Sequence, residues 1–141
     1  MKKQALTLIG MLSLLLAAGS ALAQSAGQTV QANIPFSFVV NKQALPAGQY
    51  TISRIGTGGN ALVIHDDTRK ENMVALSNNL ESRDPAAKTK LVFRCYGDRY
   101  FLSQVWIQGS SAGRQLPKSA HESEVALDFT AKDVVVLASL R

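Results

Sequence analysis

The stretch LVFRCYGDRYFLSQVW, from Leu91 to Trp106, decides the fold. Gly97-Asp98 separates two runs that are rich in aromatic and β-branched residues. Glycine at the first central position of a two-residue turn predicts a type II′ turn, because that position needs a positive φ. The stretch is therefore predicted to form a β-hairpin in which Tyr96 faces Arg99.

The two faces of this hairpin differ in character, because opposed residues share a face and faces alternate along each strand. One predicted face belongs to the core and contains Leu91, Phe93, Cys95, Tyr100, Leu102 and Trp106. The other is an amphipathic outer face with Val92, Arg94, Tyr96, Arg99, Phe101 and Ser103. Its candidate surface for a partner or an acidic ligand is Arg94, Tyr96, Arg99 and Phe101. The alternative is a plain solvated face.

Cys95 is the single cysteine of the chain. One cysteine forms no intramolecular disulfide, so the sequence does not describe a disulfide scaffold. Its place on the apolar face predicts a buried side chain that packs as a small hydrophobe. An intermolecular disulfide and a reactive thiol are the alternatives.

The N-terminus has the three-part pattern of a secretory signal peptide. Lys2 and Lys3 precede an apolar run of 14 residues, 5–18, and Ala21-Leu22-Ala23 has the small-x-small form that signal peptidase cleaves. The run is shorter than the roughly 20 residues that span a bilayer as a helix. We therefore expect residues 1–23 to be removed and the protein to be exported to the periplasm or beyond the cell. An uncleaved anchor is the alternative.

The remaining residues, 24–141, are expected to form a single domain. Without Lys2 and Lys3, the 15 Lys and Arg residues become 13 against 10 Asp and Glu. These basic residues are scattered, so no nucleic-acid partner is expected. The mature chain contains no second apolar stretch long enough to span a membrane.

Short strands account for most of the mature chain. Apolar residues alternate over 34–40, where Pro35 suggests an edge or a bulge because proline lacks an N–H. Further strands are predicted at 49–55, 61–65, 72–77 and 134–138, and the last is expected to be central or buried on both faces. Polar connections are expected at 78–90 and 107–117.

One short helix is expected near the C-terminus. Ser119 and Glu122 have the Ser-x-x-Glu spacing of a capping box, which predicts a helix over 119–127. With seven or eight short strands separated by turns, the fold class is mainly β, either an antiparallel sandwich or a small barrel.

Chemistry-bearing residues are few. His65, Asp67, His121 and Glu124 are candidate metal ligands, but nothing in the sequence brings them together. Aspartates after a strand are also typical of turns. Ser111 has a Gly-x-Ser-x-Gly spacing, from Gly109 to Gly113, but it lies in a Gly- and Ser-rich connection and not at a strand-to-helix turn. We therefore expect no catalytic residues and no cofactor.

Three segments carry a resemblance to a family. LPAGQYTISRIGTGGNALVI (45–64), KLVFRCYGDRYFLSQVW (90–106) and RQLPKSAHESEVAL (114–127) are similar to segments of a family of small secreted bacterial proteins without an assigned activity. The resemblance implies an exported β-rich domain. It implies no cofactor and no catalytic residue.

The sequence therefore predicts an exported, non-enzymatic β-domain with a binding or structural role, whose partner is a protein or a small molecule. One alternative is a carrier of a small apolar ligand in a cavity lined by Phe36, Phe38, Phe93, Tyr100 and Trp106. The other is a metal-dependent enzyme that uses His65 and His121. The sequence leaves the oligomeric state and the redox state of Cys95 open.

Overall fold

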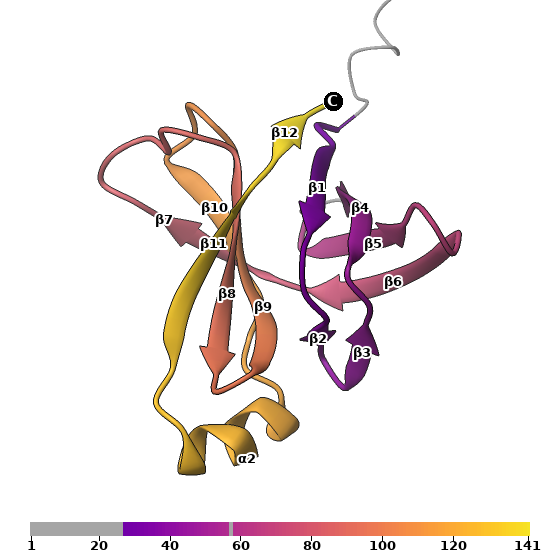
Figure 1. The fold of residues 1–141 in the computed structure, drawn as a ribbon. Coiled ribbons are helices and arrows are strands. Elements are labelled where there is room, and N and C mark those ends of the chain that lie inside the picture. The colour runs from indigo at the N-terminus through magenta and orange to yellow at the C-terminus, as the bar shows by residue number, and fades with distance from the viewer. Residues whose placement is uncertain (1–26, 57) are drawn as a thin grey trace, which may run out of the picture.

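A computed structural model describes residues 27–56 and 58–141, which form twelve strands and one helix, α2 (Ala120–Asp128) (Figure 1). The predicted signal peptide lies outside the described residues. One sheet, called sheet A here, contains β1 (Val30–Ile34), β4 (Gly48–Ile55), β5 (Ala61–Asp66), β6 (Glu71–Leu76) and β12 (Ser139–Leu140). Sheet B contains β2 (Phe38–Val40), β3 (Gln43–Leu45), β7 (Asn78–Glu81), β8 (Lys90–Tyr96), β9 (Arg99–Trp106), β10 (Ala112–Gln115) and β11 (Lys132–Leu137).

The two sheets pack face to face as a β-sandwich and do not close into a barrel (Figure 1). Sheet A has the order β12-β1-β4-β5-β6, and sheet B has the order β11-β8-β9-β10-β7 with β2 and β3 attached beside β9. Nearly all neighbours are antiparallel, and β2 with β9 is a parallel pair. The predicted mainly-β class with one short helix is confirmed. Among the described residues, no helix is long and apolar enough to cross a membrane.

The chain changes sheet where the predicted strand 34–40 breaks. β1 ends at Ile34 in sheet A, and β2 begins at Phe38 in sheet B. Pro35 has no N–H to donate to a ladder, so the break falls where pairing is weakest. The prediction of one continuous strand was therefore wrong, although the alternation of apolar residues was real. Ile34, Phe38 and Val40 all enter the shared core.

Predictions for three other segments were wrong. The two expected polar connections, 78–90 and 107–117, contain β7 and β10, which pair with each other through four residue pairs. The apolar strand near the C-terminus is β11, which lies at the edge of sheet B, not at its centre. Val135 and Leu137 are 51% and 58% exposed. A continuous apolar run thus marked an edge strand with one face in the core and apolar residues on the other.

The β8–β9 hairpin follows the predicted register near its turn. Tyr96 pairs with Arg99, and Gly97 has a φ of 64°. The register then shifts between Val92 and Phe93, where β9 contains one extra residue, a β-bulge. Beyond the bulge Trp106 pairs with Lys90 and faces away from the inter-sheet core, so its predicted place in that core was wrong.

Aromatic side chains fill the space between the sheets. The Phe36 ring stacks on Tyr100 at 3.8 Å between centroids and meets Phe93 edge-on at 5.0 Å. Phe38 lies between Tyr50 and Phe93, at 5.0 and 5.5 Å. Four of the five side chains that would have lined a carrier cavity therefore pack in this cluster, and Trp106 lies on the other face of sheet B. The structure thus contradicts the predicted inter-sheet ligand cavity.

A buried arginine links the two sheets where the chain passes from β6 to β7. Arg114 of β10 is 5% exposed. Its Nε donates to Ser77 Oγ at 2.9 Å, and its Nη2 donates to the Ser77 carbonyl at 2.6 Å. Burial lowers the pKa of Arg114, and the nearby charge of Arg54 lowers it further. Neutral oxygens of the crossing segment therefore solvate this charge.

Gly113 allows Trp106 to lie flat against β10, and this contact generates a prediction. A Cβ on Gly113 would stand 2.7 Å from Trp106 Cε3 and 2.8 Å from its Cδ2. Gly113→Ala should therefore displace the indole and lower the free energy of unfolding by about 1–3 kcal/mol. Urea unfolding measures the loss, and Trp106 emission reports the displacement. Gly27→Ala is the matched control, because a Cβ there meets nothing within 4 Å. Equal stability of the two variants would contradict the contact.

The tyrosines predict a loss of stability at high pH. Burial raises the pKa of Tyr50 to about 12, with a further contribution from the carboxylate of Asp66. Burial also raises the pKa of Tyr96, and the neighbouring Cys95 raises that of Tyr100. The unfolded chain, with ordinary phenols, releases these protons first. Stability should therefore be constant below about pH 10 and fall between pH 10 and 12.

Absorbance titration of the phenolates tests this expectation. In the folded protein, ionisation should be delayed beyond pH 10 and should coincide with unfolding measured by circular dichroism. Tyr50→Phe should weaken the pH dependence, while losing the bond that the Tyr50 hydroxyl donates to the Pro46 carbonyl at 2.6 Å. Phenols that all titrate near pH 10 in a folded protein would contradict the burial effect.

Candidate functional site

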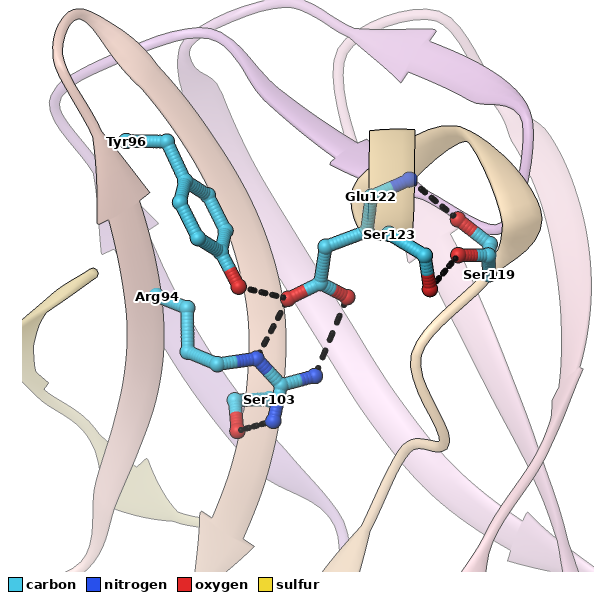
Figure 2. Close-up of polar contacts among 6 residues, drawn as sticks. All are labelled: Arg94, Tyr96, Ser103, Ser119, Glu122 and Ser123. Atoms are coloured by element: carbon cyan, nitrogen blue, oxygen red, sulfur yellow. Dashed lines mark hydrogen bonds and ion pairs between the residues drawn. The ribbon is translucent and has the colours of Figure 1, made fainter. Parts of the chain in front are cut away.

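Helix α2 begins as the sequence predicts but uses its capping glutamate differently. Ser119 is the N-cap, and its Oγ accepts a hydrogen bond from the Glu122 N–H at 3.2 Å. The Glu122 side chain does not complete a capping box. It is 2% exposed and points away from the helix toward β8 (Figure 2). The glutamate of the predicted capping box is therefore a buried contact between the helix and sheet B.

Glu122 meets a set of polar side chains on the hairpin (Figure 2). Arg94 forms a bidentate pair with it, Nε to Oε1 and Nη2 to Oε2, the latter at 3.1 Å. The Tyr96 hydroxyl donates to Glu122 Oε1 at 3.0 Å, and Arg94 Nη1 donates to Ser103 Oγ at 2.9 Å. Ser103 is the extra residue of the bulge. One guanidinium thus joins the helix to the irregular point of β9.

The outer hairpin face is covered by the protein itself. Tyr96 and Phe101 pack against Val125 of α2 in a small second core and are 1% and 2% exposed. Arg94 lies beneath the same helix, whereas Arg99 at the hairpin turn remains exposed. The predicted solvated, partner-binding face was wrong for three of its four residues. The amphipathic pattern was real, and the segment that it contacts is α2.

The candidate metal ligands are not assembled. His65 on sheet A lies with its Nδ1 2.6 Å from Asn72 Oδ1 and its Nε2 3.8 Å from Asp67. His121 belongs to α2, and its ring lies 5.9 Å from that of Phe101 on sheet B. Within the described residues, no three His, Cys, Asp or Glu side chains come together. His65, Asp67, His121 and Glu124 therefore do not form the site that the metal-enzyme alternative needs.

Cys95 is buried near the end of β8, as predicted. Its thiol donates to the Gly97 carbonyl at 3.2 Å and lies beside Tyr100. The thiol therefore contacts the hairpin turn and the edge of the aromatic core. It serves packing in this arrangement.

A cleft of about 320 Å³ lies at the other end of the outer face of sheet B. We call it the Trp106 cleft. Its lining residues come from the β7–β8 connection and from β8 and β9, and they are Ser82, Asp84, Pro85, Ala86, Ala87, Lys90, Gln104 and Trp106. Lys90 and Trp106 are a cross-strand pair, and Gln104 is two residues away on the same face. Helix α2 and the Trp106 cleft thus lie toward opposite ends of one sheet face.

Backbone hydrogen bonds fix the wall of the cleft. The N–H of Ser82 donates to the Ser111 carbonyl at 2.8 Å, and that of Ala86 donates to the Ser110 carbonyl at 3.0 Å. The N–H of Gly109 donates to the Ala86 carbonyl at 2.9 Å. These bonds join the β7–β8 connection to the β9–β10 turn. The cleft is therefore preformed, with its shape set by the backbone.

The floor of the cleft also has a fixed orientation. Trp106 Nε1 donates to Gln104 Oε1 at 2.8 Å. Indole nitrogen only donates, so this bond turns the amide NH₂ group of Gln104 away from the ring. The sequence analysis missed Gln104, Lys90 and the wall because the bulge has no sequence signature as clear as the turn. Gly113 in a β-strand beside a tryptophan was the available signal.

Comparison with protein-family models, curated proteins and solved structures finds no match to this chain. The resemblance to small secreted bacterial proteins therefore stays a prediction.

The buried Arg94–Glu122 pair generates a stability prediction. Glu122→Gln keeps the size of the side chain but leaves the Arg94 charge, 12% exposed, without its carboxylate. Removing one member of a buried pair costs about 3 kcal/mol or more. Glu124→Gln, at an exposed position of the same helix, should change stability by less than about 0.5 kcal/mol. Chemical unfolding of both variants checks this, and similar losses would show that the pair contributes nothing specific.

Proposed function

We propose that this chain is an exported, non-enzymatic binding domain that holds a small ligand in the Trp106 cleft. The observation that carries the proposal is a preformed cleft of about 320 Å³ whose charged side chains form no ion pair among the described residues. Neither Lys90 nor Asp84 forms an ion pair within 4.0 Å in the described part of the chain. By contrast, the fold itself uses Arg94 and Glu122. Charged groups that line a cavity without internal partners are suited to a ligand.

The lining favours binding over catalysis. It contains no histidine and no cysteine, and the hydroxyl of Ser82 forms no hydrogen bond to another side chain among the described residues. A serine nucleophile needs such a base. The lining therefore supplies recognition groups: an ammonium, a carboxylate, an amide and an apolar wall.

Export is supported by the N-terminal sequence, with its lysines, apolar run and Ala-Leu-Ala motif. A domain outside the cytoplasm meets small molecules of the surrounding medium. The proposed role is therefore to bind such a molecule and not to transform it.

Native mass spectrometry tests the proposed export and the proposed ligand binding, on protein purified from the exported fraction of the cells that produce it. We expect a polypeptide that begins at Gln24 and carries a small non-covalent mass. Gln104→Leu should lose this mass, whereas Lys118→Met, at an exposed position outside the lining, should keep it. A chain that still begins at Met1 would contradict export. A bare polypeptide, together with no response of Trp106 fluorescence to the small molecules of that fraction, would contradict binding.

A further inference from the structure

The charged groups of the Trp106 cleft define the chemistry of its ligand, and this inference rests on the proposed function. Lys90 lies on the sheet floor and Asp84 on the loop wall, and no ion pair within 4.0 Å joins them. Two opposite charges that do not pair with each other therefore line one small cavity. A ligand with one charge would satisfy one of them and leave the other without a partner.

The donors of the cleft are concentrated on the floor. Lys90 faces Trp106 across the hairpin, so Gln104 is its diagonal neighbour on the same face. The Gln104 carbonyl oxygen is used by Trp106 Nε1, which leaves the amide NH₂ to donate. An ammonium next to an amide donor is suited to a carboxylate, because charge-assisted hydrogen bonds are the strong ones.

The acceptors of the cleft are on the wall. Asp84 presents a carboxylate and Ser82 presents a hydroxyl, and both belong to the connection that is fixed by backbone bonds to the β9–β10 turn. These groups are suited to an ammonium. Pro85, Ala86 and Ala87, which follow Asp84 in the chain, add an apolar surface to the lining.

The volume of the cleft and the burial of Trp106 limit the class of ligand that can bind. A volume of about 320 Å³ is at the lower limit of small-molecule sites, which run from roughly 300 to 1,000 Å³. Trp106 is 8% exposed, and its ring lies against Gly113. It therefore offers no open aromatic face on which a sugar ring could stack. A compact molecule that carries one positive and one negative group fits these constraints.

From this arrangement we infer that the Trp106 cleft binds a small zwitterion of the α-amino-acid type. The ligand carboxylate lies on Lys90 and Gln104, and the ligand ammonium lies on Asp84 and Ser82. The ligand side chain contacts the wall formed by Pro85, Ala86 and Ala87.

Trp106 is the only tryptophan of the chain, so its fluorescence reports on this cleft. The mature protein is titrated with the neutral α-amino acids. The tightest binder is then compared with two matched probes, the amine that lacks its carboxylate and the acid that lacks its ammonium. Each truncated probe should bind at least about tenfold more weakly, because each loses a charge-assisted contact.

Two variants assign the ends of the ligand. In Lys90→Met the amino acid and the amine should bind equally, and in Asp84→Asn the amino acid and the acid should bind equally. Lys118→Met is the control, and unchanged unfolding midpoints show that the variants are folded. Probe titrations with glucose and with acetate complete the set.

The other results of these titrations distinguish a wrong ligand class from a wrong proposed function. If the acid binds as tightly as the amino acid, or if only glucose binds, the zwitterion inference is overturned and the cleft remains a binding site. If no probe binds but the native mass spectrum shows a bound molecule, the ligand class alone is wrong. If no probe binds and the polypeptide is bare, both the ligand class and the proposed function fail.

Discussion

One extra residue in β9 determines the arrangement of sheet B. Ser103 has no partner on β8, because the register shifts between Val92 and Phe93. Such a bulge turns every later side chain of the strand to the other face. Phe101 and Trp106, five positions apart, therefore both face outward. With a regular ladder, Trp106 would enter the inter-sheet core and the cleft would have no floor.

The bulge makes both faces of the hairpin apolar, so both need a cover. Sheet A covers one face, and the other is covered in two parts, by α2 near the turn and by the β7–β8 connection near Trp106. Arg94 provides hydrogen-bond partners for the polar side chains that are buried under α2, because it bonds Ser103 in the bulge and Glu122 in the helix. A buried ion pair contributes less to net stability than its loss would cost, since each charge alone is poorly solvated. The pair therefore fixes where α2 docks more than it adds to overall stability.

The division of the outer face also explains why the cleft is suited to binding. Its floor is a paired sheet and its wall is tied by three backbone hydrogen bonds, so a ligand orders little of the protein when it binds. Lys90 and Asp84 both line this cleft and form no ion pair with each other within 4.0 Å. Two unlike charges left unpaired in one rigid cleft are the physical basis for the proposed zwitterionic ligand.

Local chemistry in the sequence was sufficient for several elements. Glycine before Asp98 determined the hairpin turn and its register as far as Phe93 and Leu102, because that turn needs a positive φ at its first central residue. Ser119 determined the start of α2, since its hydroxyl caps the first helical turn. Runs of apolar residues between turn signals identified β4, β5 and β6. These signals act within a few residues, so they are visible without the rest of the fold.

The sequence by itself thus determined a β-rich domain with one capped helix, and the tertiary structure decided which faces meet. The bulge at Ser103, the turn of Glu122 toward Arg94 and the edge position of β11 each depend on a segment far away in the sequence. The same holds for the Trp106 cleft, whose wall and floor come from separate segments. An amphipathic face indicates that something covers it, but not whether the cover is solvent, a partner or the chain's own helix. That choice is made by packing over long sequence separations, which no local pattern encodes.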